Sequence, residues 1–373
     1  MAAEKQYNVG IIGYGLSAKV FHIPFIALTP CLKLHSIVQR SPISGNSAPE
    51  DHPAVKHFTD AKPLLSDPEV DVVVLCTPPN THFSIAKEAL LSNKHVLVEK
   101  PFVPTSAEAD ELTALARKQQ KVLCVYQNRR WDSDFLTVQK LLRENTLGRI
   151  VEFETHFDRL RLAKPPASSW KAGLKMDNGG GALYDLGSHL LDQVYVLFGM
   201  PSGVSGKFVN QREGRIVKGN GTEEDEPDSV TAVLSYNDTG LLVYVRVGVA
   251  SVESQQMRFW VRGTKASYHK TGLDPQEDHL RKGGKATDEA FGKEDEARYG
   301  KLCVVGDDGT TVTDGICPTV EPETYLKFYE LFAKAVASGK EEDVPVPASQ
   351  ALAVLQMIEA VRESARTGRE VAP

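Results

Sequence analysis

The chain has 373 residues, of which 41% are hydrophobic and 25% are charged, a composition typical of a globular protein with two domains. Its formal net charge of −6 gives no overall attraction to nucleic acid or to an anionic membrane. No apolar run approaches the roughly 18–20 residues that a membrane helix needs, and the N-terminus lacks the apolar stretch of a signal peptide. Five scattered cysteines without metal-ligand spacing favour a reducing compartment. We therefore expect a cytoplasmic protein without nucleic-acid or membrane partners.

Short apolar runs alternate with helical patterns in the first third of the chain. Strands are expected at residues 9–12, 32–38, 70–76, 95–99 and 121–126, and helices at 20–28, 84–91 and 107–119. Because parallel strands are joined by crossover helices, this alternation predicts a doubly wound α/β domain over residues 1–130. The turn formers of Pro42–Pro53 interrupt the alternation and are expected to form a surface loop or a mobile flap.

The pattern changes after residue 130. A helix is expected at 131–145, a strand at 151–160, a helix at 181–198, and strands at 229–236, 241–249 and 256–261. Hairpin signals at Asn237–Gly240 and Arg262–Thr264 indicate an antiparallel sheet, so we predict a second, α+β domain over residues 131–373. The polar segment Lys270–Lys301 is expected to be a long solvent-facing loop. Helices at 324–337 and 349–367 are expected to pack back on the core, including that of the first domain.

A glycine-rich turn follows the first strand, in the sequence Gly10-Ile-Ile-Gly-Tyr-Gly-Leu-Ser-Ala18. Gly13 and Gly15 allow a tight turn in which backbone N–H groups approach a pyrophosphate at a helix N-terminus, and the small Ala18 allows close packing of helix on strand. The position of the motif, inside a βαβ unit, predicts a dinucleotide-binding Rossmann domain. The residues expected to contact the cofactor here are Gly13, Tyr14, Gly15 and Leu16.

The second strand indicates which dinucleotide is bound. NAD is normally recognised by a carboxylate at the end of this strand, which bonds the ribose 2′-hydroxyl, but here the strand ends in Ile37-Val-Gln-Arg-Ser41. The Arg40 guanidinium and the Ser41 hydroxyl suit an adenosine 2′-phosphate, so NADP is preferred and NAD is the alternative. The other interpretation of Arg40 is a solvated loop charge.

Polar motifs follow three further strands, at the sheet edge where open α/β folds bind their ligands. In Cys76-Thr-Pro-Pro-Asn-Thr-His82, Asn80 and His82 can hydrogen-bond ribose or phosphate, and the same segment can serve to cap the next helix. Glu99-Lys100-Pro101 follows the next strand, and Gln127 follows the one after that. The cofactor residues predicted for this edge are Thr77, Pro78, Asn80, His82, Glu99, Lys100 and Gln127.

Together these motifs resemble the glucose–fructose oxidoreductase / inositol dehydrogenase family of two-domain dehydrogenases. The resemblance covers almost the whole chain and rests on Gly10–Ala18, Cys76–His82, Glu99–Pro101 and Gly179–His189. It implies a large, mostly antiparallel open sheet in the second domain, and assembly into homodimers or homotetramers. Gly13–Ser17 and Gln127–Asp132 look most like the subgroup that contains NADP-dependent scyllo-inositol dehydrogenases.

The resemblance also implies roles for single residues. It implies that Glu99 contacts the cofactor ribose or amide, that Lys100 hydrogen-bonds the reacting oxygen, and that the Lys100–Pro101 peptide bond can be cis. Two segments depart from the family pattern. Pro42–Pro53 looks like an insertion beside the adenosine pocket, and Lys270–Lys301 has no counterpart that assigns it a role.

Asp185 and His189 lie four residues apart on a predicted helix and therefore project from one face of it. The preceding Gly179-Gly-Gly181 lets the backbone approach a ligand closely. A single histidine on an otherwise apolar helix is more often a core residue, but the nearby carboxylate and the family pattern favour a functional pair. A third ligand is not evident, so no metal is expected.

These residues predict hydride transfer between nicotinamide and a secondary alcohol or ketone of a cyclitol or sugar. His189 is suited to take the hydroxyl proton as general base, Lys100 to stabilise alkoxide character, and Asp185 to hold a substrate hydroxyl. Because polyols need polar donors beside an apolar surface, the candidate substrate residues are Arg129, Trp131, Asp158, Arg159 and Trp170. An ion pair between domains or a buried aromatic is an equal alternative for each of these.

Two other functions are compatible with the sequence. The first is a non-catalytic, dinucleotide-binding, sugar-sensing regulator, because the resemblance extends to fungal galactose repressors that bind dinucleotide without turnover. The presence of Lys100, Asp185 and His189 favours an enzyme over this regulator. The second keeps the chemistry and changes the substrate, as in an aldose dehydrogenase, a dihydrodiol dehydrogenase or a keto-sugar reductase.

Overall fold

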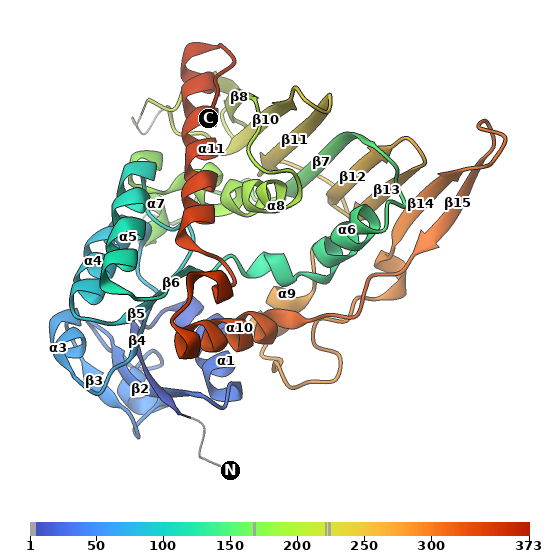
Figure 1. The fold of residues 1–373 in the computed structure, drawn as a ribbon. Helices are drawn as coiled ribbons and strands as arrows, with labels where there is room; N and C mark the ends of the chain where they lie inside the picture. Colours follow the sequence, from blue (N-terminus) through green and yellow to red (C-terminus); the bar gives the residue numbers. More distant parts are fainter. Residues whose placement is uncertain (1–4, 167–168, 221, 223–224) are drawn as a thin grey trace. The chain divides into compact units, whose positions relative to one another are not determined.

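The fold is that of a computed structural model that describes residues 5–166, 169–220, 222 and 225–373 (Figure 1). The chain forms two compact units. Unit 1 contains Met1–Asn128, Asp278–Phe291 and Glu323–Leu352, and unit 2 contains Arg129–Glu277, Gly292–Pro322 and Ala353–Pro373. The sequence predicts one boundary near residue 130, whereas the chain returns to unit 1 in two later segments. Within the described ranges, no helix is both long enough and apolar enough to span a bilayer.

A six-stranded sheet forms the centre of unit 1, with strand order β3-β2-β1-β4-β5-β6 and parallel pairing throughout. The strands are β1 (Tyr7–Ile12), β2 (Leu32–Val38), β3 (Lys56–Phe58), β4 (Val72–Leu75), β5 (His95–Val98) and β6 (Leu123–Val125). The crossover helices are α1 (Ile23–Leu28), α3 (Ala61–Ser66), α4 (His82–Leu91) and α5 (Ser106–Gln119). The predicted Rossmann domain is thus confirmed, and its strand order reverses between β1 and β4, where such folds bind dinucleotides.

The residue types explain why these elements form where they do. Val72–Leu75 is fully buried, as expected for a parallel strand that helices cover on both faces. Helix α5 begins where the Thr105 side chain accepts a hydrogen bond from the Glu108 N–H, and it ends at Gln120 in the left-handed conformation. The helix after β1 begins differently, because Ala18–His22 is a π-helical turn that leads directly into α1.

Helix α10 (Thr324–Ser338) comes late in the chain but belongs to unit 1, where it lies beside α1 (Figure 1). It contributes the aromatic side chains of Tyr325, Phe328 and Tyr329, all fully buried. The Phe328 ring packs edge-on against Tyr126 with centroids 4.8 Å apart, and Tyr329 stacks on Phe25 at 6.0 Å. A helix from the far end of the sequence therefore completes the core of unit 1.

The Pro42–Pro53 segment is more ordered than the predicted loop. It contains the short helix α2 (Ala48–Asp51), and the Ser47 hydroxyl accepts a hydrogen bond from the Glu50 N–H at its start. Ile43 and Asn46 pair through two backbone hydrogen bonds of 3.2 and 2.8 Å. The segment is therefore a structured excursion from the end of β2.

A nine-stranded sheet dominates unit 2, with strand order β15-β14-β13-β12-β7-β11-β10-β8-β9. The β7–β11 pair is parallel and the other pairs are antiparallel. The strands are β7 (Ile150–Asp158), β8 (Gly203–Asn210), β9 (Arg215–Val217), β10 (Ser229–Tyr236), β11 (Leu241–Gly248), β12 (Met257–Gly263), β13 (Ala266–Thr271), β14 (Gly300–Val305) and β15 (Val312–Cys317). The predicted α+β domain with a large, mostly antiparallel sheet is confirmed.

Helices α6 (Ser133–Arg143) and α8 (Ser188–Phe198) belong to unit 2, and α8 contacts the sheet at β7 and β11. A buried ion pair between Arg258 of β12 and Asp134 of α6, 2.9 Å long, joins helix to sheet. The Arg258 guanidinium also donates to the Gln193 side-chain oxygen at 2.7 Å. These partners offset the cost of burying the charge. The last helix of the chain, α11 (Ala348–Thr367), contributes residues to both units.

The prediction of a solvent-facing loop at Lys270–Lys301 holds for residues 282–290, which are mostly exposed, but it is wrong for the start of the segment. Lys270 is fully buried and forms a 2.6 Å ion pair with Glu294. Asp274 is buried too and accepts 2.8 Å hydrogen bonds from the Ser133 N–H and hydroxyl. Helix α9 (Gln276–Arg281) occupies the middle of the segment. The charged composition misled the prediction because a buried charge is tolerated where distant residues supply its partner.

The role of α10 gives a stability prediction. Phe328→Ala should lower the free energy of unfolding by about 3–5 kcal/mol, because it leaves a cavity against Tyr126. Lys327→Ala, at the neighbouring exposed position, should change it by less than about 0.5 kcal/mol. Urea unfolding followed by circular dichroism measures both. Equal midpoints for the two variants would contradict the assignment of α10 to the core of unit 1.

Candidate active site

Four strands of unit 1 end in register at one edge of the sheet. Ile12, Leu75, Val98 and Val125 are successive cross-strand partners. The ladder continues one residue further, since Cys76 N–H donates to the Ile12 carbonyl (2.8 Å), Glu99 N–H to Leu75 (3.1 Å) and Tyr126 N–H to Val98 (2.8 Å). The predicted cofactor motifs that follow β1, β4, β5 and β6 are therefore held along one carboxyl edge, as the parallel topology requires.

The two glycines of the turn after β1 are required for different reasons. Gly13 has a φ of +99°, and a Cβ there would lie 2.5 Å from the Cys76 carbonyl oxygen, so the fold itself demands glycine. A Cβ on Gly15 would meet no protein atom within 4 Å, and its φ is not positive. Neither the backbone nor packing within the chain explains Gly15. Open space beside a glycine at a helix start is what a dinucleotide pyrophosphate needs.

Tyr14, between the two glycines, is tied to the excursion after β2. Its hydroxyl donates a 2.7 Å hydrogen bond to Asp51, and Lys19 forms a 3.2 Å ion pair with the same carboxylate. Burial and the Asp51 hydrogen bond raise the pKa of Tyr14, and the same bond lowers the pKa of Asp51. The hydroxyl proton of Tyr14 is therefore engaged with Asp51, so its hydroxyl can meet a cofactor only as an acceptor.

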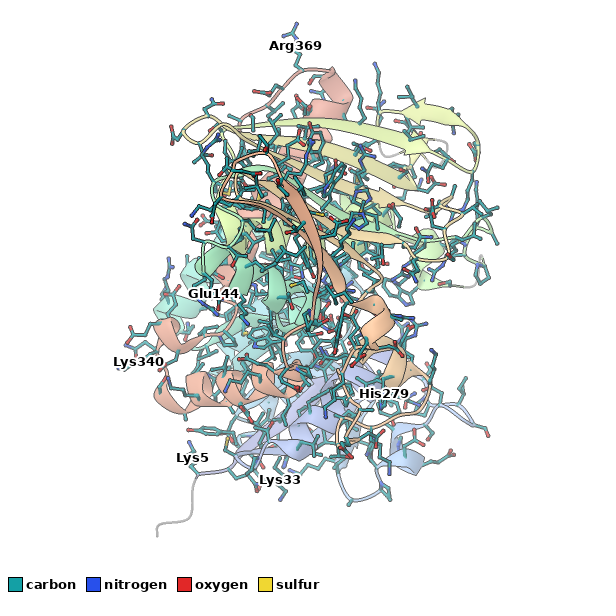
Figure 2. The ribbon with its side chains drawn as sticks, turned by 90° about the vertical axis from the view of Figure 1, so that its right-hand side faces the viewer. Lys5, Lys33, Glu144, His279, Lys340 and Arg369 are labelled. Atoms are coloured by element: carbon teal, nitrogen blue, oxygen red, sulfur yellow. The ribbon has the colours of Figure 1, made fainter. Side chains whose placement is uncertain are left out.

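Gln39, at the end of β2, anchors the other side of the same excursion. Its side-chain nitrogen donates to the Asn46 carbonyl and its oxygen accepts from the Ala48 N–H, both at 2.7 Å. The next two residues, Arg40 and Ser41, are exposed, as is Lys33 near the start of the strand (Figure 2). The strand thus ends in an amide that binds its own chain, followed by a guanidinium and a hydroxyl in solvent.

Thr77, Pro78 and Asn80 lie at the start of the turn after β4, and Asn80 is exposed. The prediction that His82 contacts ribose or phosphate is wrong. The imidazole is fully buried, its Nδ1 faces the Pro101 and Phe102 carbonyls at 3.1 and 3.0 Å, and its Nε2 faces the Thr77 carbonyl at 2.8 Å. Burial lowers its pKa. His82 instead ties the turn after β4 to the segment after β5.

Glu99 follows β5 and is held by several donors. Its Oε1 accepts from the Ser17 hydroxyl and from His22 Nε2 (2.9 Å), and its Oε2 accepts from the Lys100 N–H (3.0 Å). Burial acts to raise the pKa of Glu99, but His22, the Lys100 charge and the Ser17 hydrogen bond together lower it, with His22 contributing most. The Lys100 side chain is half-buried, and the Lys100–Pro101 peptide bond is cis, as the resemblance implies.

Gln127 follows β6 with a side chain that is almost fully buried. In the part of the chain that the structure describes, its side-chain oxygen has no hydrogen-bond partner. A buried amide oxygen without a donor is costly, so its position favours a ligand donor such as a carboxamide.

Asp185 and His189 do not lie on one regular helix. Asp185 belongs to a π-helical turn, Leu183–Gly187, and α8 begins only at Ser188. The Asp185 carboxylate is 38% exposed and forms a 2.8 Å ion pair with Lys171 of the short helix α7 (Trp170–Gly173). The His189 ring is buried near Phe157, with centroids 6.2 Å apart. Lys171 is thus a partner of Asp185 that the sequence patterns did not reveal.

Phe157, at the end of β7, is the centre of a second group in unit 2. The guanidinium carbons of Arg129 and Arg159 lie 5.0 and 4.8 Å from its ring centroid. Burial lowers the pKa of Arg159. Phe157 was not among the predicted residues, although the alternation of buried side chains along β7 places it inward with Phe153.

The other predicted substrate residues differ in exposure. Arg129 is buried, with a 3.0 Å ion pair to Asp132 and a second to Glu277, and both pairs lie within unit 2 and are not the expected ion pair between domains. Trp131 is only 7% exposed, which fits the buried-aromatic alternative. Asp158 is bonded to His156 Nδ1 at 2.8 Å, and Trp170 is 54% exposed. Of these four, Asp158 and Trp170 keep accessible surface for a ligand.

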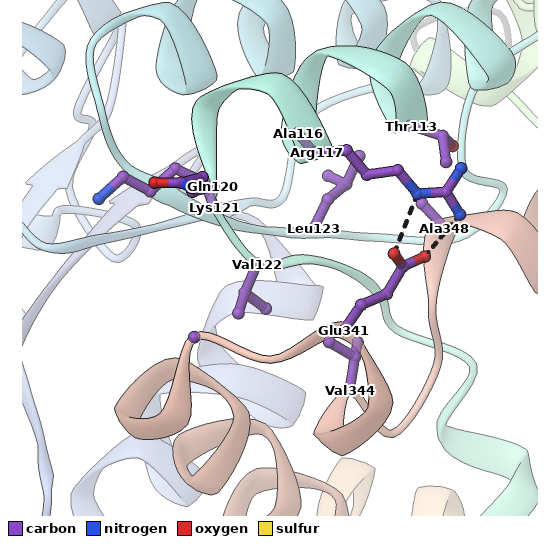
Figure 3. Close-up of a pocket in the computed structure, with 11 residues that line it drawn as sticks. Thr113, Ala116, Arg117, Gln120, Lys121, Val122, Leu123, Glu341, Val344 and Ala348 are labelled. Carbon is purple, nitrogen blue, oxygen red and sulfur yellow. Dashed lines mark hydrogen bonds and ion pairs between the residues drawn. The ribbon is translucent and has the colours of Figure 1, made fainter.

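Two other features of unit 1 are not candidate sites for this chemistry. A hollow of about 480 Å³ lies between the end of α5 and the segment after α10, bordered by the ion pair of Arg117 with Glu341 (Figure 3). It lies beside the start of β6, at the opposite edge of the sheet from the glycine turn. His35, Asp67 and Glu69 are close enough to share a cation, but Lys56 already binds both carboxylates, at 2.9 and 2.5 Å.

Comparison with known proteins agrees with this arrangement. Residues 7–127 match the family described as "Oxidoreductase family, NAD-binding Rossmann fold", and residues 139–372 match its "C-terminal alpha/beta domain". The chain belongs to this oxidoreductase family, which is the glucose–fructose oxidoreductase / inositol dehydrogenase family that the motifs resemble.

Relatives span the whole chain. An uncharacterized oxidoreductase of Schizosaccharomyces pombe is 36% identical over 98% of both chains. The scyllo-inositol 2-dehydrogenase (NADP(+)) IolW of Bacillus subtilis is 32% identical over 98% of this chain and 95% of its own. Among solved structures, the yvaA oxidoreductase of Bacillus subtilis superposes with a TM-score of 0.88 at 31% identity, covering 99% of both chains. The chain is therefore an oxidoreductase with a nucleotide-binding Rossmann domain.

Proposed function

We propose that this protein is an NADP(H)-dependent oxidoreductase that interconverts a secondary alcohol and a ketone of a cyclitol or sugar. The observation that carries the proposal is the carboxyl edge of the unit 1 sheet. There the glycine turn, Glu99 and Lys100 follow strands that end in register. The name of the relative IolW supports a cyclitol as substrate class and NADP as cofactor.

The residues of unit 1 fit a dinucleotide. The space beside Gly15 suits the pyrophosphate, and the buried oxygen of Gln127 suits the nicotinamide carboxamide as an acceptor. Gln39 stands where an NAD enzyme has its acid, and its amide is engaged with Asn46 and Ala48. Arg40 then supplies the positive charge that a 2′-phosphate requires.

The chemistry that NADP(H) supplies when bound is hydride transfer at its nicotinamide ring. Oxidation of the alcohol removes a hydride from carbon and a proton from oxygen. In the proposal His189 takes that proton as general base, and the Lys100 ammonium stabilises negative charge as it develops on the oxygen. Asp185 holds a second substrate hydroxyl, and Lys171 orients its carboxylate. In the reverse direction His189 returns the proton to the ketone oxygen.

The surroundings of Phe157 support a polyol or sugar as substrate. The Phe157 ring is itself buried, but the Arg159 guanidinium that packs against it supplies the donors that sugar hydroxyls require. Asp158 adds a carboxylate, and the exposed Trp170 adds an apolar aromatic surface. In this function we expect the protein to act in the cytoplasm as a homodimer or homotetramer.

Two alternatives remain distinct from the proposal. A dinucleotide-binding regulator would bind NADPH without turnover of any polyol. An aldose or dihydrodiol dehydrogenase would share Lys100, Asp185 and His189 and differ only in the substrate it prefers.

The first prediction concerns Gly15. Gly15→Ala should weaken NADPH binding by roughly 10-fold to 100-fold, because the added methyl group occupies the space assigned to the pyrophosphate. Its melting temperature without cofactor should match that of the wild type. Gly13→Ala is the matched control and should unfold at a lower temperature, since its Cβ would collide with the Cys76 carbonyl. Unchanged NADPH affinity in folded Gly15→Ala would refute the assignment.

A second prediction tests the choice of cofactor. Arg40→Ala should raise the KM for NADP+ by roughly 10-fold or more and leave the KM for NAD+ nearly unchanged, because only NADP+ carries the 2′-phosphate. Lys33→Ala removes an exposed positive charge from the other end of β2 and is the control for general electrostatics (Figure 2). An equal effect on both cofactors would rule out a 2′-phosphate contact.

The third prediction tests the function itself. Absorbance of NADPH should report turnover with at least one member of a panel of inositols, aldoses, ketoses and dihydrodiols. Lys100→Ala and His189→Ala should lower kcat by at least about 100-fold while NADPH still binds. Tight NADPH binding without turnover of any panel member would favour the regulator. Full activity of either variant would overturn the mechanism.

A further inference from the structure

His22 occupies an unusual place in unit 1. It is the last residue of the π-helical turn Ala18–His22, and its ring is fully buried. A π turn widens the helix and is found mostly where a side chain must take a position that a regular α-helix would not give it. Here both ring nitrogens have a partner: Nε2 lies 2.9 Å from Glu99 Oε1, and Nδ1 lies 2.5 Å from the Tyr329 hydroxyl.

The direction of the hydrogen bond between His22 and Glu99 can be assigned. Burial raises the pKa of Tyr329 strongly, so its hydroxyl keeps its proton and can donate to His22 Nδ1. An ionised carboxylate can only accept, so His22 Nε2 carries the proton that it donates to Glu99, while Nδ1 lies against the Tyr329 hydroxyl. Tyr329 and Glu99 thus hold the His22 ring from its two nitrogens, and the Nε2–H is directed at the carboxylate.

Glu99 accepts two further hydrogen bonds, and these also favour its ionised form. The Ser17 hydroxyl donates to Oε1 and the Lys100 N–H donates to Oε2. A carboxylate offers about four acceptor positions, so these three donors leave about one, on Oε2, for a ligand hydroxyl or amide. Since only 12% of the Glu99 side chain is exposed, water contributes little to holding its charge.

We propose that His22, held by Tyr329, is a positioning residue that keeps Glu99 ionised and aimed at the cofactor. The inference rests on the proposed function, in which Glu99 contacts the ribose or amide of NADP(H). The His22 imidazole, in the turn after β1, and the Tyr329 hydroxyl, on α10, together keep the Glu99 carboxyl group ionised. Neither His22 nor Tyr329 touches the reacting atoms in this proposal.

The environment of Glu99 makes its ionisation depend on this arrangement. Burial opposes the charged form of Glu99, and His22 is the largest of the influences that favour it. Removing the Nε2–H donor therefore raises the pKa of Glu99 and moves protonation toward neutral pH. The titratable groups that face Glu99 are His22, Cys76, His82, Lys100 and Tyr329.

The test is the pH dependence of NADPH binding, measured by fluorescence titration of the full chain between about pH 6 and about pH 8.5. His22→Leu removes the donor, and its affinity relative to the wild type should fall about tenfold as the pH is lowered across this range. Titration of the NADPH 2′-phosphate is common to all variants and cancels in this ratio. His22→Gln restores an N–H donor and should return the ratio toward one at every pH.

Two further variants separate positioning from packing. Tyr329→Phe keeps the ring and removes only the hydroxyl, so it should show a smaller loss in the same direction as His22→Leu, and it serves if His22→Leu does not fold. Phe332→Leu disturbs the packing of the same helix against Phe328, about one turn further along α10 than Tyr329, so it should lower stability and leave the pH dependence of binding unchanged. A pH dependence like that of the wild type in folded His22→Leu and Tyr329→Phe would overturn the inference.

An infrared measurement separates this inference from the proposed function. The difference spectrum between each protein and its Glu99→Gln counterpart isolates the carboxyl band of Glu99. At about pH 6 the band should be that of a carboxylate in the wild type and that of a carboxylic acid in His22→Leu. If the wild type did not bind NADPH, the proposed function would fail, and these bands would still decide whether His22 controls the ionisation of Glu99.

Discussion

The in-register ending of β1, β4, β5 and β6 is the constraint on which the rest of unit 1 depends. Backbone hydrogen bonds extend the ladder to Cys76, Glu99 and Tyr126, so each following motif starts at a fixed place on one edge. Parallel strands impose this arrangement, because their carboxyl ends all point the same way. The glycine turn and Glu99 are neighbours for this reason, although four connections between successive strands separate them in sequence.

Holding a carboxylate at this edge demands donors from several parts of the chain. A buried charge is tolerated only when hydrogen bonds replace its lost hydration. Glu99 obtains them from the turn after β1 and from its own neighbour Lys100, and α10 fixes His22 in turn. The same principle explains unit 2, where Arg258 and Lys270 are buried against carboxylates. In both units, the contacts that fold the chain also place the partners of its buried charges.

The sequence alone predicted the features that local patterns control. Five of the six strands of unit 1, the glycine turn and the position of Glu99 follow from apolar runs and from motifs at their ends, whereas the short strand β3 was not predicted. Features that depend on distant partners were missed or wrong: the burial of His82 by carbonyls after β5, and the ion pair of Arg129 with Glu277. The π turn that carries Asp185 also escaped, because its residues have the same apolar spacing as an ordinary helix.

The late position of α10 has a consequence for biosynthesis. A ribosome releases the strands of unit 1 first, but the aromatic faces of Phe25 and Tyr126 are covered only when residues of α10 arrive. The nascent Rossmann segment must therefore keep an incomplete core while unit 2 is translated, a period in which exposed apolar surface invites chaperone binding or aggregation. The order in which residues are synthesised therefore differs from the order in which the core is completed. The nucleotide-binding unit, although synthesised first, is among the last parts of the protein to complete its core.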